Sequence, residues 1–167
     1  MNSPVAETAV INSSPLIFLG RAGRLDLLKG VIDFCFVPEQ VRTEIWIRGE
    51  DDRTVQALSM NPWIKTVAVP AIPESITAWG LGPGESSVMA FALTDPTKNI
   101  IAVIDDLAAR HCAASLGIPV RGTLGIVLIA KRRGLIPLAK PVMQELIIHG
   151  MHLSRSVLHQ ALARVGE

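Results

Sequence analysis

An alternation of short strand-like runs with amphipathic segments of about ten residues is the feature that most constrains how this chain folds. The strand-like runs lie at residues 8–11, 34–37, 64–69, 100–104 and 119–121. The run at 100–104 is apolar throughout, as expected of a strand that is buried on both faces of a parallel sheet. Strands that alternate with helices are typical of parallel sheets. We therefore predict an α/β fold, a three-layer α/β/α sandwich with a central parallel sheet of four to five strands.

The size of the chain fits one domain. At 167 residues, with 49% hydrophobic and only 19% charged residues, it is long and apolar enough to bury a full core. We expect a single domain over residues 1–167, in which residues 138–167 form a C-terminal helical extension. The apolar face between residues 142 and 151 either completes the core or packs against a second subunit.

Charge and composition exclude several classes of protein. Sixteen Lys and Arg against fifteen Asp and Glu give a net charge of +1, so any contact with nucleic acid needs a local basic patch. No apolar stretch is long enough for a transmembrane helix, and residues 1–7 lack the basic region of a signal peptide. Cys35 and Cys112 lie in apolar runs without CxxC spacing, which indicates buried free thiols. We therefore expect a cytoplasmic protein with no membrane association.

Polar residues gather where the predicted strands end. In open parallel sheets, ligands bind in the crevice outside the carboxyl ends of the strands. Asn12 and Ser14 follow the first run, and Asp105 and Asp106 follow the run at 100–104. The chain has no phosphate-binding loop ending in Lys-Ser/Thr and no GxGxxG after its first strand, so these nucleotide-binding motifs are excluded.

Two further carboxylates predict either a metal site or ordinary helix charges. Glu44 lies on a helix that follows a strand, and Glu85 opens the helix after the glycine-rich turn at 80–84. Carboxylates that converge from separate elements repel one another unless a cation neutralises them, and Mg²⁺ or Mn²⁺ can activate water toward phosphate. In the alternative, Glu85 complements a helix dipole and Glu44 faces solvent. Asp105 and Asp106 are then helix caps.

Several short motifs follow one another along the chain in an order that matches a known family. They are VINSSPLI at 10–17, LGPGES at 81–86, IDD at 104–106, GTLG at 122–125 and GLIP at 134–137. In this pattern the chain resembles PIN-domain proteins, most closely the bacterial and archaeal branch related to VapC toxins. The resemblance spans nearly the whole chain, and its LGPGE and GTLG blocks are the most specific.

The resemblance implies a fold, an activity and a set of residues. Proteins of this branch are compact α/β/α sandwiches, usually Mg²⁺- or Mn²⁺-dependent ribonucleases, and often the toxin of a toxin–antitoxin pair. RNA is then the substrate, a small antitoxin protein is a partner, and the chain forms a homodimer. The catalytic and metal-binding cluster of the family maps here to Asn12, Glu44, Glu85 and Asp105, with Asp106 adjacent and Ser14 as a supporting hydroxyl.

One position departs from the family pattern. The first motif of the family carries Asp where this chain has Asn12. An amide oxygen can ligate a hard cation but contributes no charge, so metal affinity and water activation both weaken. Two hypotheses stay open. Either the chain is a metal-dependent endoribonuclease of weakened activity, or it is a catalytically degenerate module that binds RNA or protein.

Basic residues near the predicted site are candidates for steering the RNA backbone. They are Arg110, Lys131, Arg132 and Arg133. In the alternative, the last three residues simply favour the C-terminal end of their helix. With 4% aromatic residues and no Tyr, the chain offers no evident platform for stacking bases.

Overall fold

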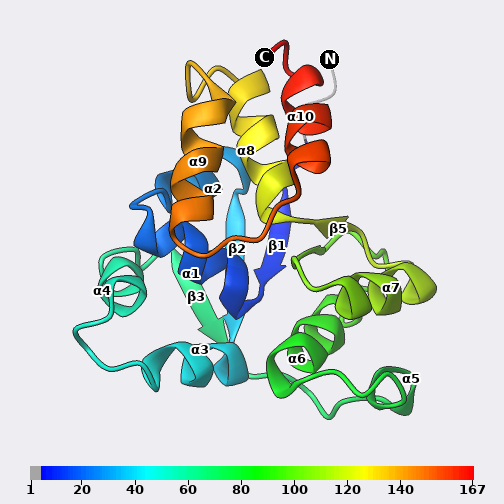
Figure 1. Cartoon of the computed structure of the whole chain (residues 1–167). Helices are drawn as coiled ribbons and strands as arrows, with labels where there is room; N and C mark the ends of the chain where they lie inside the picture. The colour runs from blue at the N-terminus through cyan, green and yellow to red at the C-terminus, as the bar shows by residue number, and fades with distance from the viewer. Residues whose placement is uncertain (1–4) are drawn as a thin grey trace.

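A computed structural model describes residues 5–167, and these contain one five-stranded sheet whose strand pairs are all parallel. The strands are β1 (Thr8–Ile11), β2 (Phe34–Pro38), β3 (Ile64–Val67), β4 (Ile101–Val103) and β5 (Val120–Arg121). Their order in the sheet is β3-β2-β1-β4-β5. Helices flank this sheet (Figure 1), so the predicted three-layer α/β/α sandwich is confirmed.

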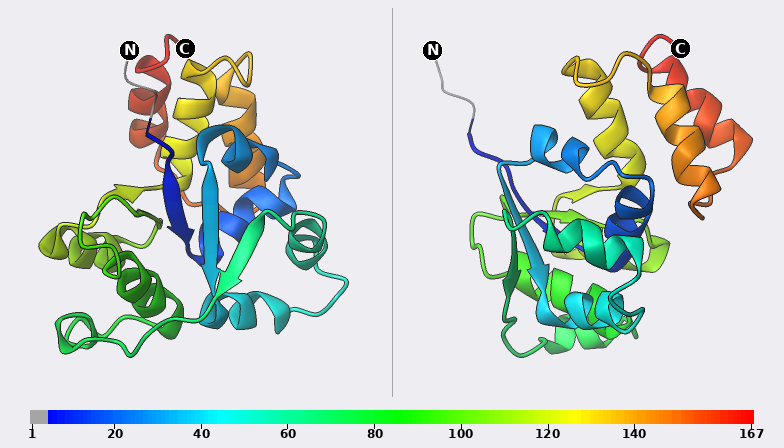
Figure 2. Two further views of the ribbon diagram at one scale, coloured as in Figure 1. Left: turned by 180° about the vertical axis from the view of Figure 1, so that it is seen from behind. Right: turned by 90° about the vertical axis from the view of Figure 1, so that its left-hand side faces the viewer.

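Helices connect the strands and extend the chain beyond the sheet. Those that precede the last strand are α1 (Ser13–Arg21), α2 (Asp26–Val31), α3 (Glu39–Trp46), α4 (Arg53–Ser59), α5 (Glu74–Thr77), α6 (Pro83–Ala92) and α7 (Leu107–Leu116). The last strand is followed by α8 (Thr123–Arg132), α9 (Ala139–Ile148) and α10 (Arg155–Ala163). The strands run from the end of the molecule that carries α8, α9 and α10 toward α3 and α6 (Figure 2).

The central strand β1 shows why the apolar runs predict this sheet. Its last three residues are fully buried, because β2 and β4 pair with it on both sides and helices cover both faces. Ile11 pairs in register with Val103. The residues that follow these two strands, Asn12 and Ile104–Asp105, therefore emerge side by side at the carboxyl edge of the sheet.

The predicted runs are longer than some of the observed strands. The run at 64–69 forms a strand only as far as Val67, whose partner in β2 is Pro38. Beyond Pro38 the neighbouring chain turns into α3, so residues after Val67 have no strand to pair with. Strand length at this edge is thus set by the neighbouring strand rather than by local propensity.

The C-terminal helices extend the same core. Helix α9 packs against α8, and α10 also contacts α8. On α9 and just after it, Val142, Leu146 and Met151 are buried in the core, whereas Ile147 remains 36% exposed. The apolar face between residues 142 and 151 therefore serves mainly to complete the core.

Two further expectations concern the thiols and the membrane. Cys35 and Cys112 are both free and buried, as predicted. Burial raises the pKa of the Cys35 thiol to about 12. Within residues 5–167, none of the helices has the length and apolar character needed to cross a membrane.

Candidate functional site

Asn12 lies at the carboxyl end of β1 and links this strand to two other elements. Its backbone N–H donates to the carbonyl oxygen of Val103 at 3.1 Å, which continues the pairing with β4. The residue is only 1% exposed, and Nδ2 of its side chain donates to Oε1 of Glu85 at 3.1 Å. Glu85 stands in the first turn of α6. The fold thus joins two predicted site residues that are 73 positions apart in the chain.

The other end of the Asn12 amide has an unsatisfied oxygen. Oδ1 is buried and has no hydrogen-bond partner. A buried acceptor without a partner costs about 1–3 kcal/mol. Turning the amide over would set this oxygen against the Glu85 carboxylate, where two acceptors repel, so the observed orientation is favoured while no cation is near. Asn12 Oδ1 is therefore an oxygen that a donor or a cation would satisfy.

Glu44 on α3 meets the N-terminal end of α6. The N–H of Gly84 donates to Oε1 of Glu44 at 3.0 Å. A Cβ at position 84 would lie 2.6 Å from that oxygen, so a side chain there would displace the Glu44 carboxylate from this position. Free N–H groups and the helix dipole stabilise a carboxylate at a helix N-terminus. The second glycine of the LGPGE motif thus holds Glu44 beside the helix that carries Glu85.

Asp105 follows β4 and is held by the first residue of α8. The N–H of Thr123 donates to Oδ1 of Asp105 at 2.8 Å, and the Thr123 hydroxyl donates to Oδ2 at 2.6 Å. Thr123 is fully buried. A Cβ at Gly122 would lie 3.1 Å from Asp105 Oδ1, so the glycine leaves room for the carboxylate. The GTLG motif therefore orients Asp105.

Asp106 has a different local role. It is the N-cap of α7, and its Oδ1 accepts a hydrogen bond from the N–H of Ala109 at 2.8 Å. Helix capping is the alternative that the sequence offers for both aspartates, and in the fold Asp106 alone caps α7. Capping fixes the Asp106 side chain at the mouth of the site, where it is exposed.

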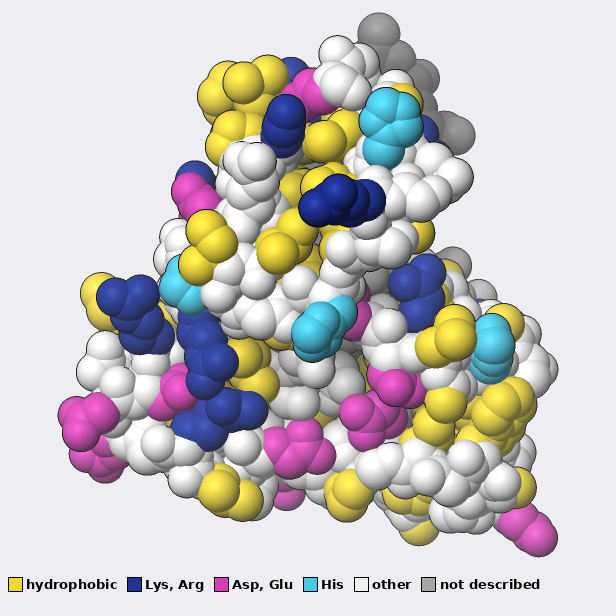
Figure 3. All heavy atoms as spheres, in the orientation of Figure 1, with side chains coloured by type: hydrophobic (Ala, Val, Ile, Leu, Met, Phe, Trp, Pro, Cys, Tyr) yellow, Lys and Arg dark blue, Asp and Glu magenta, His cyan; other side chains and the backbone are white. Residues whose placement is uncertain are grey.

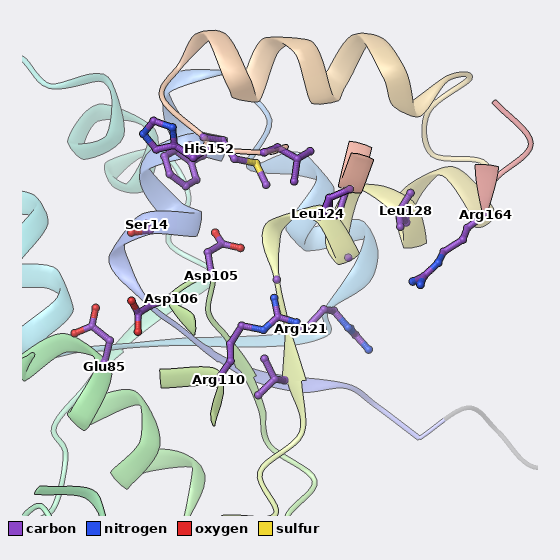
Figure 4. Close-up of a pocket in the computed structure, with 17 residues that line it drawn as sticks. Ser14, Glu85, Asp105, Asp106, Arg110, Arg121, Leu124, Leu128, His152 and Arg164 are labelled. Carbon is purple, nitrogen blue, oxygen red and sulfur yellow. The ribbon is translucent and has the colours of Figure 1, made fainter. Parts of the chain in front are cut away.

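A cavity of about 630 Å³ brings three of the predicted carboxylates together. Glu85, Asp105 and Asp106 line it together with Ser14, and Figure 4 shows these four side chains on the same side of the cavity. In the space-filling view, acidic side chains gather across the hollowed centre of this face (Figure 3). The volume lies within the range of about 300–1,000 Å³ that is typical of ligand sites.

Two of the predicted residues do not line this cavity. Asn12 reaches it indirectly, through its hydrogen bond to Glu85. Glu44 contacts the backbone of α6 one residue before Glu85. Both residues therefore support the wall that carries Glu85, while the open part of the site is formed by the other three carboxylates.

The donor types suit a hard divalent cation, but the side chains as they lie do not enclose one. Carboxylate and amide oxygens are the ligands that Mg²⁺ prefers, and the unpartnered Asn12 Oδ1 is an available acceptor. Within residues 5–167, no three or more His, Cys, Asp or Glu side chains are placed to hold a metal ion. Each carboxylate instead accepts a hydrogen bond from the protein: Glu44 from Gly84, Glu85 from Asn12, Asp105 from Thr123 and Asp106 from Ala109.

The remainder of the cavity lining is basic and apolar. Arg110, Arg121 and Arg164 line it, and they come from α7, β5 and the end of α10 (Figure 4). Arg121 is neutralised, since its two terminal nitrogens donate to both carboxylate oxygens of Glu7 at 2.8 and 3.2 Å. The hydrogen bond from Arg121 lowers the pKa of Glu7, and burial opposes this shift only in part.

The remaining basic candidates lie outside the cavity. Lys131 donates to the carbonyl oxygen of Pro137 and lies 3.8 Å from the Glu167 carboxylate. Arg133 donates to the carbonyl oxygens at positions 30 and 31, both at 3.1 Å. Arg132 is exposed beside them. Of the four predicted steering residues, only Arg110 adjoins the carboxylates.

Some lining residues were not anticipated from the sequence. Arg121 directly precedes the GTLG motif, and its place next to this motif is a sequence signal that indicates a position near the site. His152 and Arg164 also line the cavity, but they lie in the C-terminal helical part, which carries no motif of this kind. Thr123, by contrast, stands inside the GTLG motif, although its bonds to Asp105 depend on the pairing of β4 with β5, which brings the residues after the two strands together.

Comparison with protein-family models identifies a family for the chain. A protein-family model described as a PIN domain matches residues 8–167. None of the curated proteins matches the chain. The matched range contains every residue that lines the cavity, and Asn12 and Glu44 as well.

Proposed function

The chain belongs to the PIN-domain family, and from this premise we propose that it is a metal-dependent endoribonuclease, which hydrolyses phosphodiester bonds of RNA. The observation that carries the proposal is the convergence of Glu85, Asp105 and Asp106 on one cavity at the carboxyl edge of the sheet. Three carboxylates that face one solvent-filled space repel one another, and a divalent cation relieves that repulsion.

In this proposal Glu85, Asp105 and Asp106 hold Mg²⁺ or Mn²⁺, with Glu44 and Asn12 next to them. When bound, the cation supplies positive charge toward the phosphate and acidifies a water molecule. Thr123 keeps Asp105 oriented through two hydrogen bonds, so the Asp105 carboxylate would lose little rotational freedom on binding a cation. Ser14 lines the same cavity and supports the first motif.

Asn12 weakens the proposed activity. It contributes an oxygen but no charge, and its Nδ2 occupies one lone pair of the Glu85 carboxylate. For Asn12 and Glu85 to hold a cation together, the Asn12 amide would have to turn over, because its Nδ2 now faces the Glu85 carboxylate. We therefore propose an enzyme that works at higher metal concentrations than an Asp-containing site requires.

The biological setting is proposed from the resemblance to the VapC-related branch. The chain is then the cytoplasmic toxin of a toxin–antitoxin pair, opposed by a small antitoxin protein, and it forms a homodimer. We also propose that residues 1–167 act as a single domain. The contacts of α9 and α10 with α8 support this, since they tie the C-terminal helices to the rest of the core.

The experiment combines metal binding with cleavage. Mn²⁺ is titrated into the protein by calorimetry, while a mixed pool of single-stranded RNA is incubated with the protein in Mn²⁺ and in EDTA. The proposal expects saturable Mn²⁺ binding and RNA cleavage in Mn²⁺ alone, with cleavage lost in Asp105→Asn. Circular dichroism of Asp105→Asn verifies that the loss does not come from unfolding.

A second candidate function is a degenerate PIN domain that binds RNA or protein without cutting. The hydrogen bond from Asn12 to Glu85 favours this second candidate, because the bond satisfies the Glu85 carboxylate without a cation. Absence of Mn²⁺ binding at millimolar concentrations, together with intact RNA, would support this candidate over the enzyme.

A further inference from the structure

We propose that Arg110 binds a phosphate of the RNA backbone immediately beside the carboxylates, a role that rests on the ribonuclease function proposed above. Arg110 lies on α7, four residues after the N-cap Asp106, so the two side chains project from neighbouring turns of one helix face. Both line the cavity of the candidate site.

Gly122 creates the space that Arg110 and Asp105 share. A Cβ at position 122 would lie 3.2 Å from Nη1 of Arg110 and 3.1 Å from Oδ1 of Asp105. The guanidinium group and the carboxylate therefore approach the same backbone position from two sides. Without a side chain at 122, a cation-binding group and an anion-binding group stand next to each other at the mouth of the cavity.

Despite this proximity, Arg110 keeps its donors free. Within residues 5–167 its side chain forms no hydrogen bond and no ion pair, although two aspartates lie nearby. Asp105 is engaged by Thr123, and Asp106 accepts the N–H of Ala109. A guanidinium group presents five N–H donors in a planar fork that matches two oxygens of a phosphate.

The other arginines of the cavity are less suited to this task. Arg121 already donates to both carboxylate oxygens of Glu7. Arg164 lies at the end of the cavity away from Glu85 (Figure 4). Arg110 is therefore the unpaired guanidinium next to the carboxylates, and a backbone phosphate that it holds places the adjoining phosphodiester over Asp105 and Asp106.

The test measures RNA binding in the absence of metal, so that it is independent of cleavage. A labelled single-stranded RNA of about ten nucleotides is titrated with the protein in EDTA by fluorescence anisotropy, at salt concentrations between about 50 and 200 mM. The variants are Arg110→Ala and Arg110→Lys. The control is Lys29→Ala, which removes one positive charge from an exposed position on α2 outside the cavity.

Arg110→Ala should bind RNA about tenfold more weakly than the unaltered protein, as expected for loss of a charge-assisted hydrogen-bonded contact. The slope of log K against log salt should fall by about 0.7, the value for one phosphate of a single strand. Arg110→Lys should restore the salt slope of the unaltered protein but only part of its RNA affinity. Lys29→Ala should leave the salt slope unchanged and alter the RNA affinity by no more than about twofold.

Equal losses of RNA affinity in Arg110→Ala and Lys29→Ala would overturn the proposal. They would show that RNA responds to the net charge of the protein and not to a specific site at Arg110. An unchanged affinity in Arg110→Ala would overturn it as well, and would leave the proposed hydrolysis intact. Failure of the unaltered protein to bind RNA in EDTA would also overturn the phosphate site, while the proposed hydrolysis would still be decided by the cleavage assay in Mn²⁺. Loss of binding in Arg110→Ala without any Mn²⁺-dependent cleavage would sustain the phosphate site and remove the nuclease.

Discussion

The Asn12 side-chain amide donates a hydrogen bond to the Glu85 carboxylate, with an Nδ2–Oε1 distance of 3.1 Å, in the wall of the candidate site. The bond provides an uncharged donor where a site with Asp at this position would have a second carboxylate. Because Asn12 is almost fully buried, this exchange removes one negative charge from a poorly solvated position. In the proposed metal site, Asn12 would therefore favour the metal-free state over the metal-bound state.

The substitution Asn12→Asp should reverse this preference. An added carboxylate should tighten Mn²⁺ binding by about fivefold, since charges around a partly buried cation are only partly screened. In the absence of metal it should lower the melting temperature, because it meets the Glu85 carboxylate without a hydrogen bond. Melting temperatures measured in EDTA and in excess Mn²⁺ should thus shift in opposite directions. If neither temperature changes, Asn12 is not part of an electrostatic metal site.

The hydroxyl of Thr123 should contribute to stability through Asp105. Thr123→Val keeps the shape of the buried side chain but removes the donor that lies 2.6 Å from Oδ2 of Asp105. Hydrogen bonds to charged groups contribute about 1.5–3 kcal/mol, so the free energy of unfolding should fall by about that amount. Urea denaturation measures it. Thr123→Ser retains the hydroxyl and should lose distinctly less stability, and equal losses in both variants would refute a role for the hydrogen bond.

The close approach of Gly84 and Glu44 should be visible as an interaction between two substitutions. Gly84→Ala places a Cβ 2.6 Å from Oε1 of Glu44, so the carboxylate should move away and lose its hydrogen bond from the N–H at position 84, which should destabilise the fold by about 1 kcal/mol. In a Glu44→Ala background the obstacle is absent, so the same change at position 84 should cost much less. A double-mutant cycle by urea denaturation measures the difference. Additive effects would show that the glycine serves some purpose other than making room for Glu44.

The ion pair between Glu7 and Arg121 should make stability depend on pH in the acidic range. The hydrogen bond from Arg121 lowers the pKa of Glu7 in the folded protein below its ordinary value of 4.5. The unfolded chain therefore binds the proton more readily, and the contribution of Glu7 is fully present above pH 4.5. It is lost as the pH falls through the lower pKa of the folded state.

When the free energy of unfolding is measured from about pH 3 to 7, it should decrease less at acidic pH in Glu7→Gln than in the unaltered protein. Glu50→Gln serves as the control, since Glu50 is exposed and forms no ion pair within the described residues. A pH dependence that is the same in all three proteins would contradict this account of Glu7.

The sequence predicts the fold better than it predicts the contacts of the site. The continuous apolar run at 100–104 identifies a doubly covered strand, because a strand with helices on both faces cannot carry alternating polar residues. The placement of Asp105 beyond that strand follows from the same argument. The family motifs supply the remaining candidates, since Glu44 and Glu85 carry no local signal that separates them from ordinary helix charges.

Local patterns could not reveal which donor holds each carboxylate. Asp105 and Thr123 are 18 positions apart, and Asn12 and Glu85 are 73 positions apart, so their hydrogen bonds exist only after the layers have packed. The same holds for Lys131, whose position in the last turn of α8 is evident from the sequence but whose contact with Glu167 is not. Side-chain partners of this kind depend on tertiary distances that neither periodicity nor propensity encodes.

The most direct test of the central claim, a metal-dependent ribonuclease at the carboxyl edge of the sheet, is the rate of single-stranded RNA cleavage as a function of Mn²⁺ in Glu85→Gln. The control is Glu74→Gln, which makes the same change at an exposed position on α5 outside the cavity. The account predicts that cleavage by the unaltered protein requires Mn²⁺, stops in EDTA, disappears in Glu85→Gln and persists in Glu74→Gln. Cleavage that survives in Glu85→Gln, or an unaltered protein that neither binds Mn²⁺ nor cuts RNA, would contradict it.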